Sequence, residues 1–111
     1  MQWLSNGLTQ LENEMANYIL KNKKVIQCDD LQEWGEWYGN NSRRVADIEK
    51  DGVRVSTVFL GIDYPCDGGK PLLFETMIFG GEHDQEMWRC STYEEAEQGH
   101  MAACKFVGID Y

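Results

Sequence analysis

The stretch from Val53 to Gly81 constrains the fold more than any other part of the chain. It contains two runs rich in apolar and β-branched residues, 53–60 and 72–79, separated by turn-forming residues that include both of the chain's prolines. This pattern predicts two antiparallel strands joined by a long connection. The first run becomes continuously apolar toward its end, which predicts a strand that is half-exposed at first and buried on both faces later.

A single charge, Glu75, interrupts the second run. A carboxylate inside a strand must face water or meet a cation, because burying an unpaired charge is costly. Arg54 on the neighbouring predicted strand is a natural partner for it.

Two further strands flank this pair. Arg43 to Glu49 is a predicted strand, and Lys50-Asp51-Gly52 predicts a tight turn because glycine readily adopts positive φ. Gln85 to Cys90 predicts another strand. The expected fold class is therefore α+β, with an antiparallel sheet of about four strands, helices packed on it, and a C-terminal helix over about 92–107.

The last helix has a clear start and a clear apolar side. Ser91 and Glu94 have the spacing of a capping box, and Gly108 is a suitable C-terminal cap. Residues at helical spacing predict the face that packs on the sheet: Tyr93, Ala96, His100, Ala103 and Val107, with Cys104 beside them.

A second, shorter helix is predicted after Asp30, which can cap it with Glu33 completing a capping box. Gly39-Asn40-Asn41 ends it. Its shared face is expected to pack onto the sheet and holds the residues Leu31, Trp34, Trp37 and Tyr38. An aromatic binding platform is the alternative.

The N-terminal third allows two interpretations. Apolar residues at helical spacing predict a helix over about 9–20, whereas residues 17–28 also fit a hairpin with a Lys-Asn-Lys-Lys turn. Both hold in part if the helix ends at about Asn17. We expect the helix to be followed by a short hairpin. With 111 residues in all, the expected organisation is a partly helical extension over 1–14 and a single domain over 15–111.

Composition narrows the class of partner. Ten basic against nineteen acidic residues give a net charge of −9, which disfavours direct binding to nucleic acid and favours either a basic protein partner or high solubility. No apolar run is long enough for a membrane span, and the first residues do not resemble a signal peptide. Four cysteines without a Cys-x-x-Cys pair indicate reduced thiols. These features predict a soluble cytoplasmic protein.

Acidic residues are the candidate binding residues. They form two groups in the sequence, one before and within the first helix and one around the last strand and last helix. If the two helices flank the sheet on neighbouring sides, these groups would attract a basic surface. The candidates are Asp29, Asp30, Glu33, Glu36, Glu82, Asp84, Glu86, Glu94, Glu95 and Glu97.

Other chemistries receive less support. His100 and Cys104 lie one helical turn apart, with His83 and Cys90 nearby in sequence, yet no second compact pair completes a tetrahedral metal site. We expect no catalytic residues, no metal and no cofactor. A small-molecule pocket between the loop 64–70 and Trp34 and Trp37 is a further alternative, and an uncovered edge strand would permit a homodimer.

Three segments resemble a family of small proteins encoded by bacteriophages and prophages. They read VRVSTVFLGID, PLLFETMIFGG and STYEEAEQGH, and the similarity spans roughly Met15 to Val107. The resemblance implies a bacteriophage setting, supplies no catalytic residues, sets residues 1–14 apart from the common domain, and favours the hairpin over residues 18–28. It leads us to expect an accessory protein without catalytic activity that binds a host or phage protein.

Overall fold

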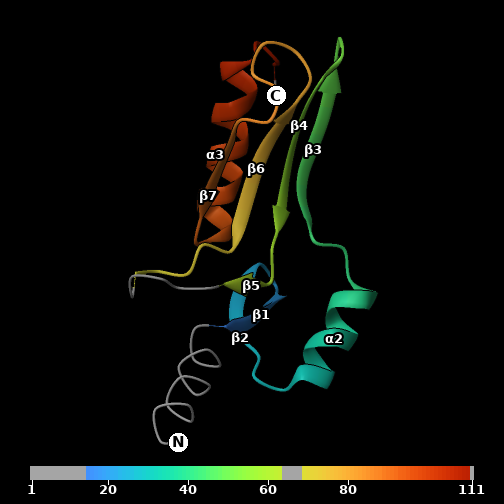
Figure 1. The fold of residues 1–111 in the computed structure, drawn as a ribbon, viewed down its shortest axis with the longest axis vertical. Coiled ribbons are helices and arrows are strands. Elements are labelled where there is room, and N and C mark those ends of the chain that lie inside the picture. Colours follow the sequence, from blue (N-terminus) through green and yellow to red (C-terminus); the bar gives the residue numbers. More distant parts are fainter. Residues whose placement is uncertain (1–14, 64–68, 111) are drawn as a thin grey trace, which may run out of the picture.

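Residues 15–63 and 69–110 are described by the computed structural model, which holds two antiparallel sheets and two helices (Figure 1). The elements are β1 (Ala16–Lys21), β2 (Lys24–Gln27), α2 (Leu31–Asn40), β3 (Arg44–Lys50), β4 (Val53–Phe59), β5 (Ile62–Asp63), β6 (Phe74–Phe79), β7 (Met87–Cys90) and α3 (Tyr93–Phe106).

The larger sheet has four antiparallel strands in the order β3-β4-β6-β7. Helix α3 lies along one face of it, packed mainly on β4 and β6 (Figure 1). This arrangement confirms the predicted α+β class, the four-stranded antiparallel sheet and the C-terminal helix. In the part of the chain that the structure describes, no helix is both long enough and apolar enough to cross a bilayer.

A second, smaller sheet of order β2-β1-β5 was not predicted as a separate unit. Its β1–β2 hairpin confirms the hairpin interpretation, and its turn residues Asn22 and Lys23 both have positive φ, as a tight hairpin turn requires. Ala16 and Asn17 pair with β5, so the predicted helix is wrong at these two positions. The rest of that helix prediction, and the extension over 1–14, lie outside the described residues.

The core under α3 follows the alternation of the strands. Val55 of β4 and Ile78 of β6 pack against Ala103 and Cys104 of α3, all of them buried. The expectation that the end of β4 is buried on both faces is wrong, because Val58 is only half-buried. Val58 lies on the face of the sheet that no described helix covers, so β4 keeps one buried and one partly exposed face along its whole length.

A chain of aromatic rings joins α2 to the large sheet and α3. Phe59, at the end of β4, contacts Trp37 of α2 at a centroid distance of 5.7 Å and Phe74 of β6 at 5.2 Å, and Phe74 in turn contacts Tyr93 of α3 at 5.9 Å. Phe59 and Phe74 are fully buried. Tyr18, Leu20 and Val25 of the small sheet pack against the same cluster, so the buried rings hold α2 and the small sheet to the large sheet.

Helix α2 starts as predicted, with the Asp30 carboxylate accepting backbone N–H groups of Gln32 and Glu33. It packs against the small sheet and the end of β4 instead of the face of the large sheet. The Trp34 indole N–H donates to the carbonyl oxygens of Tyr18 (3.1 Å) and Gly61 (3.2 Å).

The predicted apolar face of α2 is only partly correct. Trp34, Trp37 and Tyr38 are half-buried, but Leu31 is 66% exposed. Leu31 occupies the first helical position, beyond the reach of the small sheet, so it was wrongly included in the packed face.

Helix α3 begins one residue later than predicted. Thr92, not Ser91, is the N-cap, and its reciprocal partner is Glu95 instead of Glu94. The predicted packing face is confirmed, with Ala96, His100, Ala103 and Cys104 all buried.

The expected Glu75–Arg54 ion pair is wrong. Glu75 pairs with Arg89 of β7 at 2.9 Å, and Arg54 pairs with Asp47 of β3. The register explains the first pair, since Glu75 lies directly opposite Arg89, whereas Arg54 lies opposite Phe79 of β6 and cannot meet Glu75. On β3, Arg54 lies opposite Glu49 and reaches Asp47 diagonally, because Asp47 lies opposite Ser56. Cross-strand neighbours determine which charges can meet.

Candidate functional site

The candidate acidic residues occupy three separate places. Residues 29–36 belong to α2 and the turn before it, 82–86 lie in the β6–β7 connection, and 94–97 form the first turns of α3 (Figure 1). Helix α3 rises about 1.5 Å per residue over its 14 residues, so its two ends are about 20 Å apart. The second predicted group is divided between them, with residues 94–97 at the start of α3 and residues 82–86 near its end.

Several of these carboxylates stabilise local structure. Asp30 caps α2, and Asp29 accepts from the Gln27 amide. The Asp84 carboxylate accepts the backbone N–H of Gly80 at 2.6 Å, and Glu86 pairs with the His83 ring. These acidic residues therefore have a structural explanation that needs no partner.

Glu95 belongs to the same structural class. Its carboxylate accepts the backbone N–H groups of Ser91 and Thr92, and these hydrogen bonds hold its pKa below the usual range. Reversing this charge would damage the start of α3, so Glu95 is unsuitable for testing a binding surface.

Four candidates make no side-chain hydrogen bond or ion pair with any residue that the structure describes: Glu33, Glu36, Glu94 and Glu97. Of the two on α3, Glu94 has basic neighbours, since Lys23 and Lys24 line the same groove. Residues 29–42 contain no lysine or arginine. Among the described residues, the side of α2 that carries Glu33 and Glu36 therefore holds two exposed carboxylates without an ion-pair partner. The Arg43 guanidinium approaches this helix elsewhere, over the Tyr38 ring at 4.1 Å.

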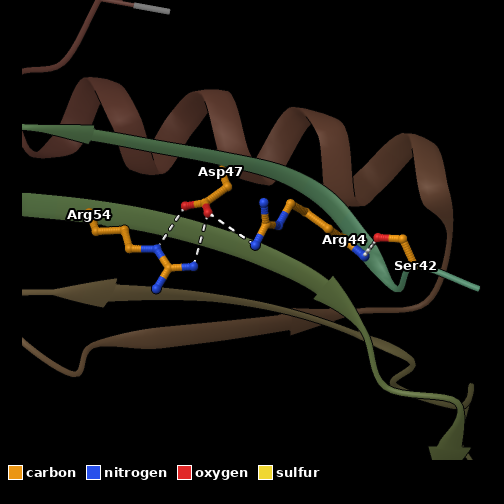
Figure 2. A network of polar contacts seen from close by, with 4 residues as sticks. All are labelled: Ser42, Arg44, Asp47 and Arg54. Atoms are coloured by element: carbon orange, nitrogen blue, oxygen red, sulfur yellow. Dashed lines mark hydrogen bonds and ion pairs between the residues drawn. The ribbon is translucent and has the colours of Figure 1, made fainter. Parts of the chain in front are cut away.

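The uncovered face of the large sheet is charged but balanced (Figure 2). Arg54 binds the Asp47 carboxylate through two hydrogen bonds of 2.8 and 2.9 Å, and Arg44 approaches the same carboxylate at 3.6 Å. The hydrogen bonds from Arg54, assisted by its charge, lower the pKa of Asp47. With the Glu75–Arg89 pair on the same face, the charges compensate one another, and this face does not extend the acidic surface.

The cysteine and histidine side chains are placed for packing more than for chemistry. Burial raises the pKa of the Cys104 thiol, and burial together with the charge of Glu95 raises that of Cys90, so neither thiol is activated as a nucleophile. The His83 ring contacts Phe106. Across the described ranges, 15–63 and 69–110, no three His, Cys, Asp or Glu side chains come together to hold a metal ion.

His100 belongs to a buried polar network between α3 and the sheet. Thr57 Oγ1 lies 2.8 Å from His100 Nδ1 and 2.7 Å from Thr76 Oγ1, and all three side chains are buried. Burial lowers the pKa of His100, against the opposing charge of Asp47. Folding therefore disfavours the protonated form of this imidazole relative to the unfolded chain.

This network predicts acid sensitivity. Below the unfolded-state pKa of about 6.5, the unfolded chain binds a proton at His100 that the folded chain does not, so the free energy of unfolding should fall as pH decreases. The slope from this one group can reach about 1.4 kcal/mol per pH unit. Urea unfolding between about pH 7 and about pH 5 measures it. A His100→Gln variant should show a flatter dependence, and an equal decline in both proteins would contradict the assignment.

A cleft of about 420 Å³ lies between β7 and α3. Trp88 and Phe106 meet edge to face at 5.9 Å in its wall, and the helix side is made of the small residues Gly99, Ala102 and Ala103. Trp88 is 46% exposed. The sequence gives only a weak indication of this cleft. A tryptophan in a short strand at the edge of a sheet has few neighbouring strands to bury it.

The polar groups of the cleft are already engaged. Thr76 bonds Thr57, Arg89 binds Glu75, and Glu95 completes the α3 cap. A small-molecule site usually offers a few convergent polar groups that orient the ligand. The cleft instead presents an apolar surface, which fits a protein side chain better than a polar metabolite.

The pocket suggested by the sequence around residues 64–70 lies mostly outside the described residues. Its two expected walls, Trp34 and Trp37, are used for packing against the small sheet and Phe59. Comparisons with protein-family models, with curated proteins and with solved structures find no match.

Proposed function

We propose that this chain is a small acidic accessory protein of bacteriophage type, which acts without catalysis by binding a host or phage protein with a basic surface. The observation that carries the proposal is the outer side of α2. This helix has no buried residue and no basic residue, and Glu33 and Glu36 point their charges to solvent from adjacent turns.

Charge concentration of this kind accelerates encounter with a basic surface and favours it over other partners. The resemblance to phage proteins suggests a sharper version, in which the acidic surface occupies the nucleic-acid groove of a bacterial defence protein and inhibits it.

The test compares two variants with the same change in charge. Glu33→Lys with Glu36→Lys reverses the α2 pair, and Glu94→Lys with Glu97→Lys reverses a pair of the same spacing on α3. Each double variant adds four charges, taking the net charge from −9 to −5. We expect a partner captured from bacterial lysate at low salt to be lost with the α2 variant, retained with the α3 variant, and lost from the wild type at high salt.

Two results would contradict the proposal. One is a captured partner that binds the α2 variant as well as the wild type. The other is binding that is indifferent to salt, because contact between an acidic and a basic surface must weaken as ions screen it. Circular dichroism of both variants establishes that each remains folded.

A further inference from the structure

The outer edge of β7 is the less protected of the two edges of the large sheet. Strand β6 pairs with one side of β7, and no described strand pairs with the other. The opposite edge of the sheet, β3, carries four charged residues among its seven and an irregularity between Arg44 and Ala46. Charges and bulges of this kind protect an edge from pairing, whereas β7 has only Arg89, which Glu75 already neutralises.

The register shows which backbone groups of β7 are free. Ile78 of β6 donates its N–H to Glu86 and accepts from Gln85, and the pairing continues with Trp88 opposite Thr76. Backbone groups of successive strand residues point to alternate sides. The N–H and C=O groups of Met87 and Arg89 therefore point outward, away from β6.

These free backbone groups can pair with the same groups of a second copy of the chain. In an antiparallel pair with a two-fold axis at Trp88, Met87 of one copy lies opposite Arg89 of the other, and each such pair exchanges two backbone hydrogen bonds. The axis brings the two Trp88 side chains opposite each other on the α3 side of the sheet, where opposed aromatic residues stabilise strand pairing.

The surroundings leave room for this contact. Because α3 packs mainly on β4 and β6, the cleft over β7 remains open, with Trp88 and Phe106 in its wall. A two-fold axis perpendicular to the sheet keeps both α3 helices on the same side, so the two clefts face each other across the new strand pair. Each cleft then receives the exposed indole surface of the other copy.

We propose that two copies of this chain associate through β7, forming a continuous eight-stranded sheet with Trp88 at the two-fold axis. Such an isologous contact uses the same surface of both copies and closes at a dimer. The acidic side of α2 belongs to a different part of the molecule and is free in the dimer to bind its partner.

Sedimentation equilibrium of the full chain tests the proposal, with wild type expected to approach twice the monomer mass as its concentration rises from micromolar to millimolar. Trp88→Lys should weaken dimerisation by about tenfold or more, although the added positive charge reduces repulsion between the copies. Met101→Lys is the matched control, because Met101 is 53% exposed and does not line the cleft. It should dimerise like the wild type.

Hydrogen exchange of the wild type provides a second measurement that needs no variant. The amide protons of Met87 and Arg89 should become protected as the protein concentration rises. A monomer mass at every concentration, or exchange at these two amides that never slows, would overturn the proposal. Added salt should strengthen the dimer because each copy carries −9, whereas it weakens binding through α2, so the two proposals can fail separately.

Discussion

Replacing Phe59 with alanine is expected to lower the free energy of unfolding by about 3–5 kcal/mol. The ring is fully buried and contacts both Trp37 and Phe74, so its removal opens a cavity where the two sheets meet. Domains of this size are stable by about 5–15 kcal/mol in total. Urea unfolding followed by tryptophan fluorescence measures the loss.

Phe79→Ala is the control for this prediction. Phe79 is the last residue of β6, and its side chain is 40% exposed on the uncovered face of the sheet, where the Arg54 guanidinium lies 5.7 Å from its ring. The same chemical change there should cost less than about 1.5 kcal/mol, because little buried volume is lost. Similar losses at the two positions would contradict the central role given to Phe59.

Gly80→Ala is expected to cost about 3–5 kcal/mol as well, for a different reason. A Cβ atom at Gly80 would lie 2.2 Å from the carbonyl oxygen of Gly52, and Gly80 has a φ of +87°. The contact joins the β3–β4 turn to the end of β6, and a clash with backbone can be relieved only by moving one of these segments. Thermal or urea unfolding of the variant tests the expectation.

Gly52→Ala separates the clash from the backbone strain. Gly52 has a similar φ of +84°, but nothing lies within 4 Å of its ideal Cβ position. Only the conformational penalty of about 1–2 kcal/mol should be observed there. If both alanine variants lose the same stability, the close approach between Gly80 and Gly52 does not contribute to the cost of the Gly80 substitution.

Local patterns in the sequence predicted most of the large sheet. The Asp51-Gly52 turn, the alternation in β4 and β6, and the packing face of α3 all depend on neighbours close in the chain. The start of α3 shows the limit of such reasoning. Ser91 with Glu94 and Thr92 with Glu95 have the same capping-box spacing, so the pattern alone does not distinguish them, and the structure forms the second.

Contacts between distant residues caused the errors. Ala16 and Asn17 form a strand because Ile62 and Asp63 pair with them, and a two-residue strand such as β5 leaves no pattern to recognise. The partner of Glu75 depends on strand register, which alternation alone does not fix. The cleft also depends on contacts between residues distant in sequence, such as Trp88 of β7 and Phe106 of α3. The second predicted acidic group was divided because its members lie near opposite ends of α3.

The bonds of the Trp34 indole have a consequence for the order in which the molecule opens. One N–H holds α2 to carbonyl groups of β1 and of the segment before β5, whereas α2 itself has no buried residue and β5 has only two residues. Units with few buried contacts unfold locally before the rest of a protein. The indole proton of Trp34 is therefore a built-in reporter, whose NMR signal should reveal α2 and the small sheet detaching while the four-stranded sheet is still intact.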